Sequence, residues 1–143
     1  MAVKKIRVIL DTNWYISATI NKRSRRLLYQ LLTNNNIVIL FSDEILKEYR
    51  LVIGRNKFRN VVSHQQVARF MNLAISKIKN IEIKSNLTGS RDPNDNFLLS
   101  LSHDAHADYL VTGDKDLLVL EEIGSTKIML MGDFLKIISH KTK

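Results

Sequence analysis

The sequence predicts a three-layer α/β/α fold, in which helices cover both faces of a mainly parallel central sheet of four to five strands. Short apolar runs rich in β-branched residues recur along the chain, and stretches with helical spacing separate them. No linker or low-complexity tract divides the 143 residues, which include one Pro and five Gly. Alternating strands and helices are typical of parallel sheets. The length fits one compact domain over residues 1–143.

The first half of the chain predicts two strands and three helices. The first strand is apolar almost throughout, as in strands buried on both faces, and a short helical turn follows it. Ser24 and Ser42 are placed to cap the first two helices, and the third is a longer amphipathic helix. In chain order these elements are Ile6–Leu10, Arg26–Thr33, Ile37–Phe41, Asp43–Ile53 and His64–Lys79.

The second half predicts three more strands and three more helices. Pro93 suits the first position of the helix that Asp92 opens, after a polar loop over Ser85–Arg91. The strands are Ile81–Ile83, Tyr109–Thr112 and Lys127–Leu130, and the helices are Asp92–His106, Lys115–Leu120 and Asp133–Ser139. Right-handed crossovers bring the carboxyl ends of all these strands to one edge, where such sheets bind ligands.

The most apolar strands predict the order of the sheet. We expect Ile6–Leu10 to be central, between Ile37–Phe41 and Tyr109–Thr112. Fully apolar strands need cover on both faces and neighbours on both edges.

Composition narrows the classes of partner and compartment. With 22 Lys and Arg against 14 Asp and Glu, the net charge is +8. This charge indicates a polyanionic partner such as nucleic acid, a membrane surface or an acidic protein, or simply a soluble surface. The absence of Cys excludes disulfides and thiolate chemistry and fits a cytoplasmic protein. No apolar run approaches the ~20 residues that cross a membrane.

Three Asp residues stand where the predicted strands and helices meet at the ligand-binding edge. Asp11 directly follows the first strand, Asp114 follows Tyr109–Thr112 after one Gly, and Asp95 lies in the first turn of its helix. Each could cap a helix, and Asp92 could pair with Asp95 as in a capping box. Gathered at one edge, however, they repel one another unless a cation lies among them. Hard oxygen ligands suit Mg²⁺ or Mn²⁺.

The helix Asp43–Ile53 offers a fourth carboxylate. On a helical wheel of ~100° per residue, Glu48 lies about 40° beyond the edge of the apolar stripe and Glu44 about 80° beyond it. We therefore expect Glu48 to reach inward and Glu44 to point toward solvent. Alternatively, Glu48 is a solvated residue near Lys47 and Arg50.

Two groups of basic residues could attract the phosphates of a nucleic acid in a salt-dependent manner. The first is the run Lys22-Arg23-Ser24-Arg25-Arg26, which we expect to flank the acidic edge. The second is Arg55, Lys57 and Arg59, beyond the Glu48 helix. Either group could instead be an ordinary solvated charge run.

Four segments resemble the acidic motifs of PIN domains, in order and at the family's spacing. They are Val8-Ile9-Leu10-Asp11-Thr12-Asn13, Ser42-Asp43-Glu44-Ile45-Leu46-Lys47-Glu48-Tyr49, Asp92-Pro93-Asn94-Asp95-Asn96-Phe97, and Ala107-Asp108-Tyr109-Leu110-Val111-Thr112-Gly113-Asp114-Lys115-Asp116-Leu117-Leu118. The resemblance covers nearly the whole chain. One departure is Trp14, where the family usually has a small aliphatic residue; core packing is its expected role.

The resemblance implies a PIN-like fold and a metal-dependent ribonuclease. It is strongest to bacterial and archaeal proteins grouped as VapC-like toxins of toxin–antitoxin pairs, which implies an antitoxin partner and a homodimer. It also implies the roles of individual residues. Asp11, Glu48, Asp95 and Asp114 hold Mg²⁺ or Mn²⁺ with Asp116 beside them, and Asn13, Thr112 and Asp92 support them.

Two other functions compete with that of a ribonuclease. One is an RNA-binding or scaffold module with the same fold and an idle site, against which the intact acidic motifs argue. The other is a Mg²⁺-dependent phosphoryl enzyme, such as a relative of response regulators or phosphatases. The first strand carries no adjacent acidic pair and no Asp-x-Asp, which argues against that class.

Overall fold

The structure, a computed structural model, describes residues 4–59 and 61–141 and has a six-stranded sheet in the order β3-β2-β1-β4-β6-β5. The strands are β1 (Ile6–Leu10), β2 (Ile37–Phe41), β3 (Lys79–Asn80), β4 (Tyr109–Val111), β5 (Glu122–Ile123) and β6 (Thr126–Met129). All pairs are parallel except β5 with β6. As predicted, β1 is central, between β2 and β4. The sheet exceeds the expected four to five strands because the two-residue β5 is too short to leave a pattern.

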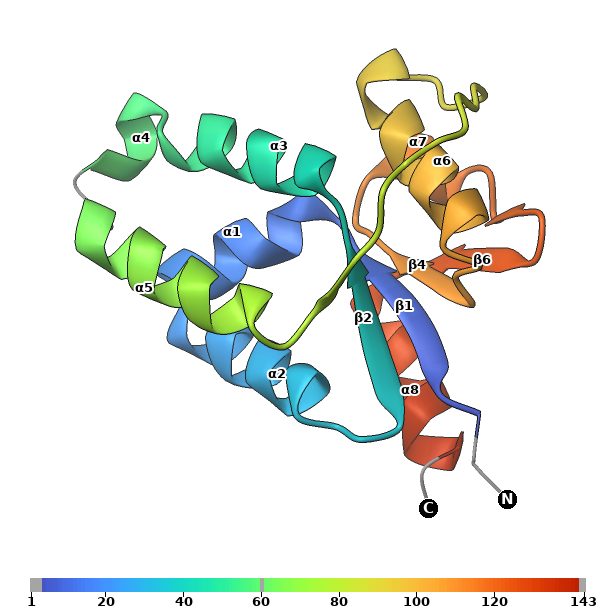
Figure 1. The fold of residues 1–143 in the computed structure, drawn as a ribbon, viewed down its shortest axis with the longest axis horizontal. Coiled ribbons are helices and arrows are strands. Elements are labelled where there is room, and N and C mark those ends of the chain that lie inside the picture. Colours follow the sequence, from blue (N-terminus) through green and yellow to red (C-terminus); the bar gives the residue numbers. More distant parts are fainter. Residues whose placement is uncertain (1–3, 60, 142–143) are drawn as a thin grey trace.

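Helices cover both faces of the sheet (Figure 1). From β1 the chain crosses to β2 and β3 in one direction and then to β4 and β6 in the other, so the two sets of crossovers lie on opposite faces. The helices are α1 (Thr12–Ile20), α2 (Lys22–Leu32), α3 (Asp43–Ile53), α4 (Asn56–Arg59), α5 (His64–Ile75), the 3₁₀ turn η1 (Pro93–Asp95), α6 (Asn96–Asp104), α7 (Lys115–Leu118) and α8 (Met131–Lys141).

The hydrophobic core follows the central strands. Val8, Ile9, Leu10, Leu110 and Val111 have no measurable solvent exposure, as expected for strands covered on both faces. Trp14, the departure from the family pattern, is partly buried and packs against this core.

The first crossover differs from the prediction. The expected short turn after β1 is the nine-residue helix α1, and α2 begins at Lys22 with Asn21 rather than Ser24 as its cap. The Asn21 side chain accepts hydrogen bonds from the backbone amides of Arg23 and Ser24. Ser42 caps α3 as predicted, through a 3.3 Å hydrogen bond from the Ile45 amide.

The third strand and the helix beyond it are also shifted from their expected positions. Helix α5 ends at Ile75 rather than Lys79, and the third strand is Lys79–Asn80 rather than Ile81–Ile83. The segment after β3 is an extended chain that runs between the start of α3 and α6 (Figure 1). Among the described residues no helix is long and apolar enough to cross a membrane.

Candidate functional site

Asp11 and Asp114 follow β1 and β4, at the point where the chain stops adding strands on one side of β1 and begins to add them on the other. Asp11 directly follows β1, and its backbone amide donates to the carbonyl of Val111 at the end of β4, over 3.0 Å. Asp11 is only 5% exposed, although its side chain is an ionisable carboxyl group. Open parallel sheets bind ligands outside the carboxyl ends of their strands at such a reversal.

The hydroxyl group of Thr112 connects Asp11 to Asp114. Thr112 Oγ1 donates to Asp11 Oδ2 over 2.6 Å and accepts from the Asp114 amide over 3.0 Å. Thr112 is fully buried, so this geometry is shielded from water. Asp11 Oδ1 in turn accepts from the Asn13 amide over 3.2 Å and caps α1. Asp11 and Asp114 therefore also cap the helices α1 and α7, and this capping role does not exclude a second role as metal ligands.

Burial and neighbouring charge act on the protonation of Asp11. Burial is the largest influence and raises the pKa of Asp11 above its ordinary value, and the charge of Asp114 raises it further. The hydrogen bonds from Thr112 and from the Asn13 amide oppose this rise, because they stabilise the carboxylate.

Among the acidic residues at this edge, Asp95 has the pKa that burial and neighbouring carboxylates raise most. Burial, a close contact with the Asp114 carboxylate, and the negative charges of Asp114, Asp92 and Asp11 together raise the pKa of Asp95 to about 8. Its Oδ2 atom is buried and has no hydrogen-bond partner. A buried carboxylate oxygen without a donor is unfavourable unless a proton or a cation reaches it.

Glu48 extends toward the same group from α3. Burial raises the pKa of its carboxyl, and the charges of Asp11 and Asp92 raise it further. The Thr12 hydroxyl and Arg55 oppose this rise, although the hydroxyl does not meet hydrogen-bond geometry. Glu48 therefore lies close enough to Asp11 and Asp92 for their charges to act on it.

Glu44 differs from the prediction. We expected it to point to solvent, but it is half-buried, and its Oε2 is buried without a hydrogen-bond partner. It lines a pocket between α3, the segment after β3 and the start of α6. A helical wheel represents α3 alone and so cannot show the segment that covers this side of it.

The supporting residues take three different positions. The Asn13 side chain is exposed, and its backbone amide rather than its side chain contacts Asp11. Asp92 caps η1 by accepting from the Asn94 amide over 3.0 Å. Asp116 Oδ1 lies 3.0 Å from Arg91 Nε in an exposed ion pair.

The group fits a divalent cation in donor chemistry but is not a preformed ligand set. Its donors are carboxylate oxygens, which suit Mg²⁺ or Mn²⁺, and Asp95 Oδ2 lacks any other partner. Within the part of the chain that the structure describes, however, no three His, Asp or Glu side chains surround a common point closely enough to hold an ion. An ion would therefore have to draw these carboxylates closer together.

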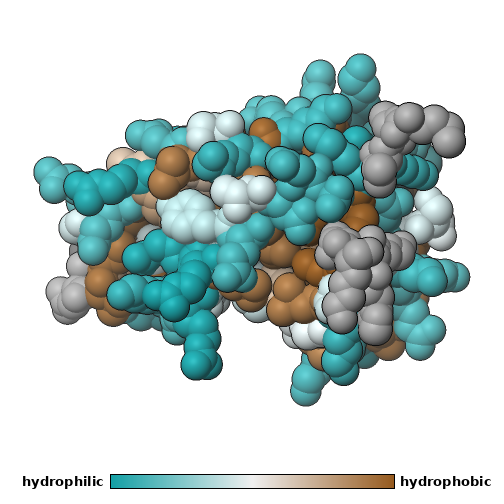
Figure 2. Space-filling model, turned by 90° about the horizontal axis from the view of Figure 1, so that it is seen from below, coloured by the Kyte–Doolittle hydropathy of each residue, from teal (hydrophilic) through white to brown (hydrophobic). Residues whose placement is uncertain are grey.

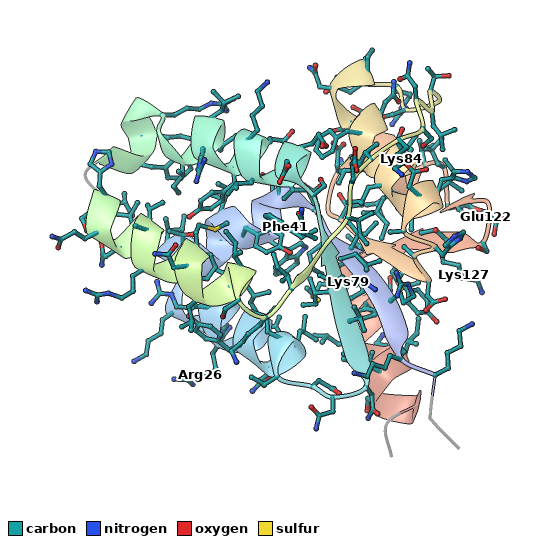
Figure 3. The ribbon with its side chains drawn as sticks, in the orientation of Figure 1. Arg26, Phe41, Lys79, Lys84, Glu122 and Lys127 are labelled. Atoms are coloured by element: carbon teal, nitrogen blue, oxygen red, sulfur yellow. The ribbon has the colours of Figure 1, made fainter. Side chains whose placement is uncertain are left out.

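The basic run lies elsewhere than expected. Helix α1 carries the chain away from Asp11 by ~1.5 Å per residue before Lys22, Arg23, Arg25 and Arg26 are reached on α2. In Figure 3, Arg26 lies far from Phe41, the last residue of β2 at the carboxyl edge. The expectation that this run flanks the acidic edge is therefore wrong.

One member of the run has a clear structural role. Arg25 donates from Nε to the Ala18 carbonyl over 2.8 Å and from a terminal nitrogen to the Thr19 carbonyl over 2.7 Å. It thus satisfies carbonyl groups at the carboxyl end of α1. Lys22, Arg23 and Arg26 are exposed. The underside of the molecule is mainly hydrophilic, with hydrophobic residues in smaller patches (Figure 2).

Other cations lie nearer the acidic residues. Arg91 pairs with Asp116 and also donates to the Lys115 carbonyl over 3.3 Å, and Lys115 directly follows Asp114. In the second basic group, Arg55 influences Glu48, and Lys57 lies 5.0 Å from the centre of the Phe58 ring. The Arg59 side chain lies outside the described residues. The position of Arg91 directly before Asp92 was the signal in the sequence that could have identified it.

Comparison with known proteins finds similarity to a family model, to a curated protein and to solved structures. A family model for the PIN domain matches residues 7–116. An uncharacterized protein of Methanocaldococcus jannaschii is 30% identical over 120 residues, which span 82% of this chain and 77% of that protein. The crystal structure of VapBC2 from Rickettsia felis, bound to a DNA fragment from their promoter, aligns with a TM-score of 0.58. That alignment covers 86% of this chain and 97% of the other, at 19% identity, and so compares the folds alone.

Proposed function

Because the chain belongs to the PIN-domain family, we propose that it is a Mg²⁺- or Mn²⁺-dependent endoribonuclease. Asp11, Glu48, Asp95 and Asp114 hold the metal in this proposal, with Asp116 beside them. The observation that carries it is Asp95: a buried carboxylate oxygen without a partner, among acidic neighbours that raise its pKa to about 8. Such crowding is unfavourable by itself and becomes favourable around a cation.

Each residue has a distinct task in the hydrolysis of a phosphodiester. Bound Mg²⁺ or Mn²⁺ would activate a water molecule and stabilise negative charge on the phosphate. Thr112 fixes the direction of the Asp11 carboxylate through its 2.6 Å hydrogen bond. Asp92 adds negative charge near Asp95 and Glu48, and the Asn13 amide holds Asp11 in place.

We assign the nearest phosphate contacts to Arg91 and Lys115. A purely acidic cluster repels RNA, and these two cations lie beside Asp116 and Asp114. Lys22, Arg23 and Arg26 form a separate basic surface on α2, suited to more distant parts of an RNA strand. Charge reversal at Arg91 should therefore reduce cleavage, whereas reversal at Arg23 and Arg26 should mainly weaken binding and flatten its salt dependence.

The experiment that tests the proposal compares the parent with Asp11→Asn on a fluorescent single-stranded RNA. We expect cleavage with Mg²⁺ or Mn²⁺, no cleavage with EDTA, and a loss of roughly 100-fold or more in the variant. Glu122→Gln is the matched control, because Glu122 is exposed on β5, away from the acidic edge (Figure 3). Parental cleavage by Asp11→Asn would remove Asp11 from the site. RNA binding without any cleavage would favour the scaffold alternative.

The proposal extends to partners. The likeness in fold to the R. felis VapBC2 complex supports a toxin that an antitoxin protein neutralises, and we propose a cytoplasmic homodimer as its free form. Expression of the chain should arrest growth, and co-expression of the product of a neighbouring gene should restore it. Asp11→Asn should not arrest growth.

A further inference from the structure

A pocket of about 390 Å³ lies beside the acidic cluster and shares two elements with it. Glu44, on one wall, is one helical turn before Glu48 on α3. Pro93 and Asn94, on another wall, belong to the turn that carries Asp95. Residues one turn apart on a helix have their Cβ atoms roughly 5–6 Å apart. A ligand in this pocket would therefore lie next to the proposed metal site.

Glu44 places a carboxylate at the wall of the pocket. Its Oε2 atom is buried without a hydrogen-bond partner. Because it lies in the first turn of α3, its negative charge complements the positive end of the helix dipole. An ionised carboxylate can only accept hydrogen bonds. The pocket therefore favours a ligand that donates N–H groups to Glu44.

The rest of the lining suits a flat aromatic ligand with polar edges. The half-buried ring of Phe97 provides an apolar surface, and the side chains of Asn86 and Asn94 are exposed at the pocket. Asn96 Oδ1 accepts from the Ser90 amide over 3.1 Å, and Ser100 Oγ accepts from the Leu87 amide over 2.9 Å. These two hydrogen bonds fasten the segment after β3 to α6, so the pocket is built by tertiary contacts.

We propose that this pocket binds a guanine base of the RNA strand, with Glu44 accepting from its N1–H and N2–H groups. Guanine presents two adjacent donors on that edge, which match a carboxylate. Adenine and cytosine place a ring acceptor beside their amino group, and uracil places its N–H between two carbonyl groups, so each repels part of the carboxylate. The inference rests on the proposed function for its RNA context.

The test measures binding without divalent metal, so it does not depend on cleavage. Isotope-labelled full-length protein is titrated with GMP, AMP, CMP and UMP, and amide NMR signals of residues 85–87 and 94–97 are followed. We expect GMP to bind about tenfold more tightly than the others, the discrimination that one bidentate pair provides. Glu44→Gln should reduce this preference to about twofold. Asp43→Asn is the matched control, because Asp43 lies in the same turn of α3 but lines a different cavity.

A second experiment measures binding of the oligonucleotides U11 and U5GU5. It tests whether the pocket recognises guanine within an RNA strand as well as in a free nucleotide. The parent should bind U5GU5 more tightly, and Glu44→Gln should bind both equally. Equal binding of all four nucleotides by the parent, or a preference that persists in Glu44→Gln, overturns the inference. RNA cleavage without any preference for guanine overturns the inference but retains the nuclease. A preference for guanine in U5GU5 without cleavage retains the pocket and removes the nuclease.

Discussion

At the residue scale, Thr112 connects positions that lie far apart in the sequence. Its hydroxyl donates to Asp11 and accepts from the amide of Asp114, and it is fully buried. The sequence motifs place Thr112 next to Asp114, and only the pairing of β1 with β4 places it next to Asp11.

Replacement of Thr112 by Val keeps the shape of the side chain and removes both hydrogen bonds. We expect a loss of about 1–3 kcal/mol in the free energy of unfolding, because Asp11 Oδ2 would be buried without a donor. We also expect Mn²⁺ affinity to fall about 10- to 100-fold, as when other groups that orient metal ligands are removed. Urea unfolding and calorimetric titration measure the two effects. Thr112→Ser retains the hydroxyl and should lose little of either.

The raised pKa of Asp95 predicts how stability depends on pH when no metal is bound. Between pH ~4 and about 8 the folded protein retains a proton that the unfolded chain releases, so stability falls as pH rises through this window. Asp95→Asn cannot titrate there. Its melting temperature should equal that of the parent near pH 4 and exceed it by roughly 2–5 °C near pH 8. Thermal unfolding in EDTA at both pH values measures this. A constant difference across the window would contradict it.

At the element scale, the largest difference between prediction and structure is α1, a nine-residue helix where the sequence predicted a short turn. Two of its buried residues are Thr12 and Thr19, which obscure an apolar period, and Thr19 Oγ1 lies 2.6 Å from Tyr49 Oη on α3. The hydroxyl of Thr19 is thus buried with a partner on another element, and the sequence does not reveal such a partner. By contrast, α3 was predicted correctly, since Ser42 caps it and its apolar stripe is regular.

The end of α1 gives a prediction that separates structure from RNA binding. Arg25 makes two hydrogen bonds to carbonyls of α1, whereas Arg23 is exposed. Arg25→Ala should destabilise the protein by about 1.5–3 kcal/mol, and Arg23→Ala by less than about 0.5 kcal/mol. Chemical denaturation compares the two. Equal effects would show that the contacts of Arg25 do not stabilise α1.

At the scale of the whole molecule, apolar runs and crossover rules predicted the centre of the sheet and the edge where the acids meet. They could not predict which side chains come within bonding distance. Asp11, Asp95 and Asp114 were chosen by their places in the sequence, and the structure brings them into mutual electrostatic influence. The unexpected positions of Glu44 and the basic run come from α1 and from the segment after β3, neither of which has a strong periodic pattern.

A bound metal should stabilise the entire fold. Mn²⁺ at 100 times its dissociation constant adds about 2.7 kcal/mol to the free energy of unfolding, a rise of roughly 5–10 °C in melting temperature. At a constant Mn²⁺ concentration, the rise should be smaller at pH 5.5 than at pH 8, because protons compete with the metal for Asp95. EDTA should reverse it, and Asp11→Asn should abolish it. An equal rise in Asp11→Asn would place the metal elsewhere.

The hydrogen bond between Thr112 and Asp11 has a consequence for synthesis on the ribosome. The two residues are 101 positions apart. At ~5–20 residues per second, about 5–20 s pass between their additions to the chain. During that interval β1 has no β4 beside it, and the carboxylate of Asp11 lacks its buried donor. The acidic edge is therefore assembled late, and a nascent chain that ends before β4 cannot form it.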